Sequence, residues 1–420
     1  MSPAGIVDSR LRGSVEDWLA LVGEKSAEAG TLLGATVAEQ DANGYRHTLR
    51  EIAQQPLTWL ETADGVPRRL GAITAALARV AGDGTDGEPG AIVLTGSGSS
   101  LYAGECLSTP LQERLGISVH AVAAGDVLTH PAGSLPPNGP CLVVSLARSG
   151  NSPESCGVLD ALPNGRCSHL VITCNRLGRL ATSYQGNPRV TTVVLDDKTC
   201  DRSLVMTSSF TNMVLAGQIL GLTRDAAAYH ARGEAVARLG ADVLLRYVDA
   251  IAGVARSAFK SAVYLGSGCR YGAARESALK MLEMTAGRVT TFPETYLGLR
   301  HGPMAAVNED ALVVCFLSSD PVIRAYELDL VRELDRKKLG ARKVIVGDGI
   351  PEEIVGPEDL AVELPGLAGL GDDGAPLLDV LVGQLLAFFR CRAIGLRPDM
   401  PSEDGVISRV VGGFALHRRS

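Results

Sequence analysis

The amino-acid sequence predicts an α/β protein with two tandem five-stranded parallel sheets and an N-terminal helical segment. Short apolar runs alternate with helical stretches, which is typical of parallel strands that are covered by helices on both faces. A strand that runs into Gly-Ser-Gly occurs twice, and the two turns end at Gly98 and Gly268. They lie 170 residues apart, about one domain length, so we predict a duplicated doubly wound domain. With 48 glycines and 4% aromatic residues, the core is expected to be aliphatic.

The start of the chain is predicted to be helical. Ser14-Val-Glu-Asp17 resembles a capping box, and apolar residues recur at helical spacing from Tyr45 to Thr62. Pro56 is expected to end or kink a helix there. The stretch 207–257 also has a helical pattern, which places a domain boundary near residue 225. The predicted division is a helical segment at 1–65, a first domain at 66–225 and a second domain at 226–420.

Five strands are expected in the first domain because their residues are β-branched or apolar on both faces. They are 91–95, 119–123, 141–146, 170–173 and 191–195. In the second domain, Tyr264–Gly268 and Val313–Leu317 repeat the first and third of these, and strands are expected near 343–346 and 360–364. The late apolar segment 377–396 carries Asp, Gln and Arg residues, so it is predicted to be a buried helix and not a membrane span.

Charge and cysteine usage narrow the class of protein. The formal net charge is -7 and the chain has no run of lysine or arginine, which excludes a typical nucleic-acid or membrane-binding surface. The nine cysteines form no Cys-x-x-Cys pair, which favours a reducing, cytoplasmic location without a structural metal. The first residues lack the features of a signal peptide. No cofactor is expected, because the sequence has neither a third glycine for a dinucleotide fingerprint nor a Walker lysine.

Two loops of the first domain are rich in glycine and serine. They are Gly96-Ser-Gly-Ser-Ser100 and Arg148-Ser-Gly-Asn-Ser152, and each joins a predicted strand to a helix. Backbone N–H groups at a helix N-terminus, with serine hydroxyls beside them, can hold a phosphate without a metal. Glycine-serine turns are ordinary when they occur alone. Because the two loops follow strands of one sheet, they favour a phosphorylated small molecule as the ligand.

A set of charged residues follows the second glycine turn. Glu276, Lys280 and Glu283 stand four and three residues apart, so on a helix they share one face. With His301 close behind, this set suits proton transfer next to a carbonyl group. The alternative is a solvated helix face with an ordinary Glu-Lys pair. The position at the carboxyl edge of a parallel sheet favours a functional site.

These segments resemble a known family. Glu51-Ile-Ala-Gln-Gln-Pro56, Glu276-Ser-Ala-Leu-Lys280 and Leu299-Arg-His-Gly-Pro303 resemble the tandem sugar isomerase (SIS) domain family, specifically its aldose–ketose isomerases. The similarity runs from about residue 45 to the C-terminus and is greatest to isomerising deaminases of galactosamine 6-phosphate. It implies two flavodoxin-like SIS domains, of which the first binds phosphate and the second carries the catalytic helix and the C-terminal tail.

The resemblance also implies roles for single residues. The hydroxyls that hold the sugar phosphate are those of Ser99, Ser100, Ser149 and Ser152. Arg148 stands beside them, where the related glucosamine-6-phosphate synthase has a glutamine.

In the second domain, Glu283 matches the carboxylate that moves a proton between the first two sugar carbons, and Glu276 and Lys280 match residues that line this site. His301 matches a ring-opening histidine that the neighbouring subunit supplies, which implies a homodimer or a larger homo-oligomer.

Two departures from the synthase are evident. The stretch before Glu51 is too short for a glutaminase domain, so glutamine is not expected to donate nitrogen. Glycines near residue 412 replace the lysine that the synthase tail brings to the sugar. The expected activity is conversion of an amino-sugar 6-phosphate to a ketose 6-phosphate and ammonia. The alternatives are an aldose–ketose isomerase without deamination, which would take a ketose phosphate, and a non-catalytic phosphosugar sensor.

Overall fold

The computed structural model describes residues 7, 9–80, 90–161, 166–402, 405–412 and 414–417. Residues 1–6, where a signal peptide would begin, lie outside this set. The chain forms two compact units, which we call the first-sheet and second-sheet units. The first-sheet unit comprises Thr58–Asp201, Ser208–Gly233 and Ile407–Ser420, and the second-sheet unit comprises Met1–Leu57, Arg202–Thr207 and Glu234–Val406.

The first-sheet unit contains five parallel strands in the order β2-β1-β3-β4-β5. The strands are β1 (Ala91–Gly96), β2 (Val119–Ala123), β3 (Cys141–Ala147), β4 (Cys167–Thr173) and β5 (Val190–Val194). All five predicted strands are therefore confirmed, with ends that differ by at most three residues. The order reverses between β1 and β3, and the carboxyl ends of strands at such a point form the usual ligand crevice of an open α/β sheet.

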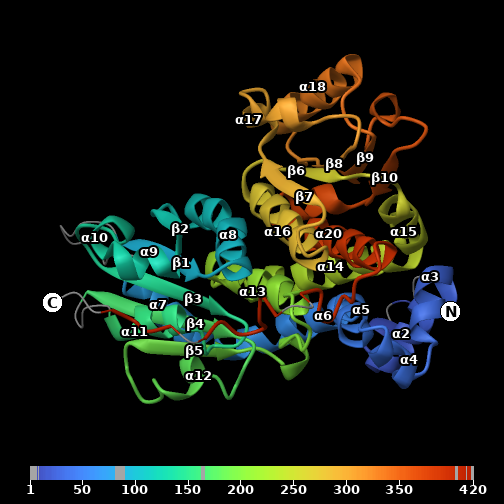
Figure 1. The fold of residues 1–420 in the computed structure, drawn as a ribbon. Helices are drawn as coiled ribbons and strands as arrows, with labels where there is room; N and C mark the ends of the chain where they lie inside the picture. The colour runs from blue at the N-terminus through green and yellow to red at the C-terminus, as the bar shows by residue number, and fades with distance from the viewer. Residues whose placement is uncertain are drawn as a thin grey trace. The chain divides into compact units, whose positions relative to one another are not determined.

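Helices cover both faces of this sheet (Figure 1). One face packs against α9 (Ala124–Thr129), α11 (Pro153–Ala161) and α12 (Arg179–Thr182), and the other against α7 (Leu70–Ala78), α8 (Ser99–Leu115) and α13 (Ser208–Gln218). Shorter elements of the unit are η1 (Val66–Arg69), α10 (Pro131–Ser134), η2 (Asp197–Thr199) and η3 (Ile219–Leu222). Two of the unit boundaries fall within α6 (Gln55–Gly65) and α14 (Ala226–Arg246).

The second-sheet unit repeats this topology. Its strands are β6 (Ser261–Leu265), β7 (Thr290–Glu294), β8 (Ala311–Phe316), β9 (Arg342–Gly347) and β10 (Leu360–Glu363). They are parallel and lie in the order β10-β9-β8-β6-β7, which is the order of the first sheet read from the other edge. The predicted duplication is thus confirmed at the level of strand order.

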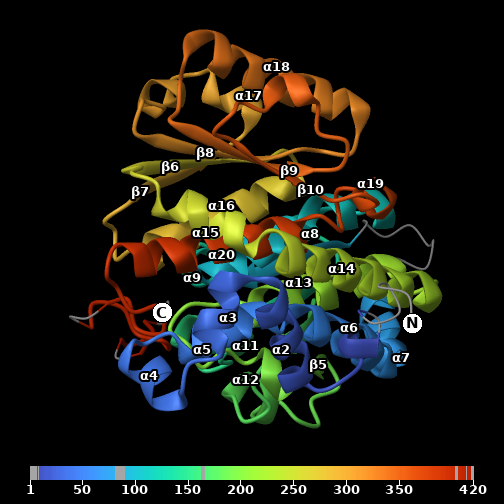
Figure 2. The same cartoon turned by 90° about the vertical axis from the view of Figure 1, so that its right-hand side faces the viewer.

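Different helices cover the two faces of the second sheet (Figures 1 and 2). The helices on one side are α15 (Val248–Arg256), α16 (Cys269–Met284) and α20 (Pro376–Ala393), and those on the other are α17 (Tyr296–Leu299) and α18 (Pro321–Lys337). The short elements η4 (Pro303–Ala306), η5 (Glu352–Ile354) and α19 (Leu367–Leu370) complete this part of the unit.

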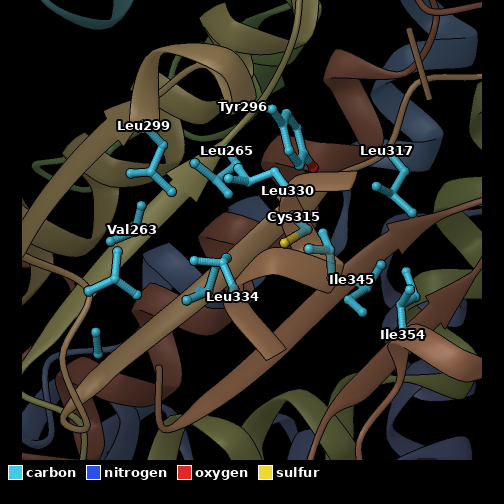
Figure 3. Packing of buried hydrophobic residues seen from close by; sticks show 14 residues of the cluster. Val263, Leu265, Tyr296, Leu299, Cys315, Leu317, Leu330, Leu334, Ile345 and Ile354 are labelled. Atoms are coloured by element: carbon cyan, nitrogen blue, oxygen red, sulfur yellow. The ribbon is translucent and has the colours of Figure 1, made fainter. Parts of the chain in front are cut away.

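The core between the second sheet and α18 is aliphatic, as the composition predicts. Val263 and Leu265 of β6 pack with Leu330 and Leu334 of α18, and each is fully buried (Figure 3). Tyr296 closes this cluster, and its hydroxyl donates to the Phe316 carbonyl oxygen at 3.1 Å. Such packing fixes the carboxyl ends of the strands from which the candidate site is built.

The N-terminal helices belong to the second-sheet unit in the contact grouping. They are α2 (Val15–Lys25), α3 (Ala27–Leu33), α4 (Val37–Ala42) and α5 (Arg46–Ala53). Ser14 caps α2 by accepting from the Asp17 N–H at 3.1 Å, and Pro56 lies in the first turn of α6, where the preceding helix has ended. The division of the chain at residues 65 and 225 stays a prediction.

One strand escaped prediction. Strand β7 is an edge strand that contains Pro293, and its residues are only partly buried. Proline is tolerated at an edge because no ladder bond is needed on the outer side. The apolar segment at 377–396 forms the buried helix α20, as predicted. Within the part of the chain that is described, no helix is long and apolar enough to cross a membrane.

Candidate active site

The predicted charged face lies on α16, and it is buried. The side chains of Glu276 and Lys280 are 0% and 1% exposed, whereas Glu283 keeps 25% of its side-chain surface. Leu279 is half-buried and Leu282 is 41% exposed. Because α16 buries its charges and exposes a leucine, it reverses the ordinary amphipathic pattern. The alternative of a solvated charged face is wrong.

Lys280 lies between the two carboxylates. Its Nζ is 2.5 Å from Oε2 of Glu283 and 3.4 Å from Oε1 of Glu276. Buried ions are costly unless they are paired, so the amine and the buried Glu276 stabilise one another. Glu283 is the member of this group that reaches the surface of the unit. The arrangement can hold an accessible carboxylate in one orientation, as proton transfer requires.

Two glycines allow close packing of α16. A Cβ at Gly266, which follows β6, would lie 2.4 Å from the carbonyl oxygen of Arg270. A Cβ at Gly383 of α20 would lie 2.3 Å from Oγ of Ser277. Real Cβ contacts do not become this short, so both positions require glycine. They allow α16 to pack closely against the end of β6 and against α20.

A buried ion pair joins α16 to α20. Arg270, in the first turn of α16, donates through Nε and Nη2 to Asp379 at 2.9 and 2.6 Å. Both side chains are 0% exposed. Burial raises the pKa of Asp379 to about 6, although the guanidinium acts in the opposite direction. This bidentate pair fixes the rotation of the helix that carries Glu283.

His301 lies after α17 on an exposed turn. The neighbouring Arg300 donates to Glu333 of α18 at 2.7 Å, and Lys337 binds the same carboxylate at 2.7 Å. Hydrogen bonds from Lys337 and Arg300 lower the pKa of Glu333 to about 2. A shallow hollow of about 500 Å³ lies beside this turn and is lined in part by Arg300 and Gly302. The network attaches the turn with His301 to α18.

The first glycine-serine loop opens α8. Gly98 has φ 56°, a conformation that favours glycine, and Ser99 and Ser100 form the start of the helix. Both serines are buried to 5–6% exposure. A Cβ at Gly96 would lie 2.5 Å from Cβ of Ser100, so the strand end can approach the helix only with glycine there. The result is a helix N-terminus that carries two hydroxyls at the end of β1.

The second loop follows β3, the neighbour of β1. Gly150 has φ 64°, and Oγ of Ser149 accepts from the Asn151 N–H at 3.3 Å. Asn175 holds this loop by donating to the Ser149 carbonyl oxygen at 2.8 Å. Ser152 donates to Ser155 at 3.0 Å. Together with the first loop, this turn forms what we call the first cradle, at the point where the strand order reverses.

Arg148 is buried and is engaged by the C-terminal tail. Its Nη2 donates to the carbonyl oxygen of Arg409. In turn, the Arg409 guanidinium donates to the Asp201 carbonyl oxygen through Nε at 2.8 Å. Leu416 lies near Gly157 of α11, where an added Cβ would be 2.7 Å from its Cδ1. The tail is therefore connected to the loop of the first cradle.

The structure gathers eight of the nine predicted residues into two groups within their own units, and the ninth, His301, lies on the turn after α17. The five residues predicted to hold phosphate lie at the ends of β1 and β3, and the charged set lies on α16. Sequence reasoning missed Asn175, Arg409 and the Arg270–Asp379 pair as supporting residues. Asp379, within the apolar run of α20, is the sequence feature that indicates a buried cationic partner.

Comparisons with known proteins agree with this architecture. An AgaS protein of Streptomyces coelicolor is 41% identical over 377 residues, which cover 88% of this chain and 95% of the relative. The chain belongs to the AgaS family. The D-galactosamine-6-phosphate deaminase AgaS of Escherichia coli O157:H7 is 34% identical over 375 residues, with the same coverage of 88% and 95%. No family model matches the chain.

Solved structures show the same fold as this AgaS-family chain. The tagatose-6-phosphate ketose/aldose isomerase of Escherichia coli is 31% identical, with a TM-score of 0.79 over 91% of this chain and 98% of that one. A Clostridium novyi NT structure that carries the same isomerase name is 31% identical, with a TM-score of 0.85 over 92% and 99% of the two chains. The expected resemblance to tandem SIS isomerases is confirmed, and the chain is an enzyme of this group.

Proposed function

We propose that this AgaS-family chain is an isomerising deaminase that converts D-galactosamine 6-phosphate and water to tagatose 6-phosphate and ammonia. The observation that carries the proposal is the carboxylate of Glu283, which is partly exposed and is held at 2.5 Å by the buried amine of Lys280. A sensor without catalysis would have no need to bury a second carboxylate, Glu276, beside that amine.

The chemistry moves one proton between two carbons and one from nitrogen to oxygen, and it consumes one water. In the open-chain amino sugar, Glu283 removes the proton from the second carbon and delivers it to the first, while a second proton passes from the nitrogen to the aldehyde oxygen. The aldehyde thereby becomes a primary alcohol, and the carbon–nitrogen bond becomes an imine. Water then adds to the imine carbon, the carbon–nitrogen bond breaks, and ammonia leaves as the ketose carbonyl forms. This last step is a hydrolysis and needs no redox cofactor.

Glu276 and Lys280 act through Glu283 in this proposal. Their side chains are 0% and 1% exposed, so they have no surface for a sugar. Lys280 fixes the direction of the Glu283 carboxylate through their 2.5 Å contact, and Glu276 pairs with the same amine from within the unit. We therefore assign Glu283 as the catalytic residue and the other two as positioning residues.

The phosphate group is assigned to the first cradle. Ser99 and Ser100 at the start of α8 and Ser149 and Ser152 after β3 offer hydroxyls beside backbone N–H groups. Arg148 contributes positive charge from within the unit, while its guanidinium also holds the tail. This assignment gives the first domain the binding role and the second domain the chemistry.

His301 is proposed to open the sugar ring from a neighbouring subunit in a homo-oligomer. Its exposure on the turn after α17 leaves the ring accessible to a partner's ligand. A cytoplasmic location is also proposed, because the nine cysteines are free thiols and eight of them are buried.

The decisive experiment is a direct assay of ammonia release by the purified chain. Galactosamine 6-phosphate and glucosamine 6-phosphate are offered separately, and Glu283→Gln is compared with Glu352→Gln, which changes an exposed carboxylate of the same unit. Ammonia from galactosamine 6-phosphate that is lost only in Glu283→Gln is the expected result.

A second candidate is an isomerase without deamination. It is favoured by the solved tagatose-6-phosphate ketose/aldose isomerase, which has 31% identity to this chain. If the purified chain interconverts tagatose 6-phosphate and an aldose but releases no ammonia from either amino sugar, the deaminase proposal fails and this candidate replaces it.

A further inference from the structure

The second sheet contains a counterpart of the first cradle, which we call the second cradle. It consists of the turn at Gly268 before α16 and the loop at residues 318–320 after β8. Gly98 before α8 has φ 56° and ψ -126°, and Gly268 before α16 has φ 55° and ψ -128°. Each turn lies at the strand next to the reversal of strand order, β1 in one sheet and β6 in the other. The backbone that could receive an anion is thus present twice.

The side chains at the two turns differ. Ser99 and Ser100 follow Gly98, whereas Cys269 and Arg270 follow Gly268. Arg270 is 0% exposed, and its Nη1 donates to the carbonyl oxygen of Leu317, which is the residue after β8. A buried guanidinium therefore lies within the second cradle, where the first cradle has small hydroxyls.

The second loops of the two cradles share one hydrogen bond. Oγ of Ser149 accepts from the N–H two residues later at 3.3 Å, and Oγ of Ser318 accepts from the Asp320 N–H at 3.0 Å. In the second cradle this loop already has an anionic partner. The Ser319 N–H donates to Oδ1 of Asp372 at 2.7 Å, and the Ser318 hydroxyl donates to Oδ2 of the same carboxylate.

Asp372 comes from the loop between α19 and α20, far from Ser318 in the sequence. Its Oδ1 lies 3.9 Å from Nη1 of Arg270, and its backbone carbonyl oxygen accepts a contact from Sγ of Cys269 at 3.1 Å. One carboxylate thus takes a backbone N–H, a serine hydroxyl and a guanidinium charge. These are the three kinds of group that recognise a phosphate.

We propose that Asp372 is an internal substitute for a phosphate, which closes the second cradle and leaves one phosphosugar site in each chain. The closed cradle anchors the start of α16, because Asp372 and Asp379 both neutralise Arg270. The comparison with a phosphate site rests on the role proposed for the first cradle. The contacts of Asp372 itself do not depend on that role.

If Asp372 occupies an anion site, its removal has a consequence that the removal of an ordinary loop-anchoring carboxylate does not have. When the carboxylate is removed, the donors of Ser318 and Ser319 and Nη1 of Arg270 remain around an empty place, while the other side of the guanidinium stays paired with Asp379. A free anion of similar charge can then enter and restore the lost stability by mass action. A carboxylate that only tethers its loop would leave no such site.

The test uses the full chain in a Ser99→Ala/Ser149→Ala background, which removes hydroxyls of the first cradle. Asp372→Ala is added to it, and thermal unfolding is followed as inorganic phosphate replaces chloride at constant ionic strength. Asp373→Ala in the same background is the control, since it removes an equal charge from the same loop.

We expect Asp372→Ala to lower the melting temperature and phosphate to raise it again by about 2–4 °C more than in the Asp373→Ala control. Equilibrium dialysis should then find one bound phosphate that the background lacks. An Asp372→Ala variant that is destabilised but unaffected by phosphate would overturn the proposal.

Asp372→Asn provides a second variant in case the alanine variant does not fold. Its amide keeps the space filled, so the variant should fold with reduced stability and show no added response to phosphate. A phosphate response equal to that expected of the alanine variant would contradict the idea that the side chain occupies the anion position. Neither measurement uses ammonia release, so failure of the deaminase proposal and failure of this inference are distinguishable.

Discussion

Lys280 pairs with Glu283 at 2.5 Å, although the lysine side chain is 1% exposed and the glutamate side chain 25% exposed. The pair joins the interior of the second-sheet unit to its surface within one helix. A carboxylate that is paired with a buried amine is held in one direction. The first prediction below follows from this pairing.

Lys280→Met should lower the free energy of unfolding by roughly 3–5 kcal/mol, because it leaves Glu276 buried without its cation. Urea denaturation measures this loss. The double variant Glu276→Gln/Lys280→Met should recover part of it, since the uncompensated charge is gone. An equal loss in the single and double variants would show that the cost comes from packing and not from charge.

Ser149→Ala should raise the KM for a sugar phosphate by roughly 10–100-fold with a smaller change in kcat, because a hydrogen bond to a charged group contributes about 1.5–3 kcal/mol. Steady-state kinetics on galactosamine 6-phosphate measures both constants. Ser108→Ala is the matched control, since that hydroxyl lies later in α8 and bonds to the Glu105 carbonyl oxygen. A similar rise in KM for both variants would contradict the assignment.

Gly383→Ala should destabilise the chain by about 1–3 kcal/mol, because its Cβ would lie 2.3 Å from Oγ of Ser277. Gly253→Ala in α15 is the control, since nothing lies within 4 Å of a Cβ there, and it should be neutral or slightly stabilising. Denaturant unfolding of both variants checks the difference. Equal stability of the two would mean that α16 and α20 can separate at no cost.

Burial lowers the pKa of His169, on β4, to about 4. The unfolded chain takes up this proton near pH 6.5. The free energy of unfolding should therefore fall as the pH is lowered from about 6.5, and this loss ends once the pH passes the folded pKa. It amounts to about 3 kcal/mol.

His169→Gln should remove that part of the pH dependence. Urea unfolding at a series of pH values, with the parent chain beside the variant, isolates the contribution of this one side chain. Parallel curves for the two proteins across this range would contradict a neutral, buried His169.

Local sequence features predicted most of the architecture. The strands of the first sheet were found because apolar residues occupy both faces, and the turns at Gly98 and Gly268 were found because their conformation favours glycine. Spacing also placed Glu276, Lys280 and Glu283 on one face of a helix, because backbone geometry sets that face within a few residues. Strand β7 was missed because a proline in an edge strand removes the usual pattern.

By itself, the sequence determined the duplicated parallel sheets, the glycine turns and the order of charged residues along α16. Only the tertiary structure decided that Glu276 and Lys280 of this face are buried, and that α16 packs closely against α20 where Gly383 meets Ser277. It also decided that Asp372 enters the second cradle and meets Arg270, a residue 102 positions earlier in the chain. Spacing follows from the geometry of one helix, whereas such contacts depend on how distant segments pack, and no local pattern encodes that.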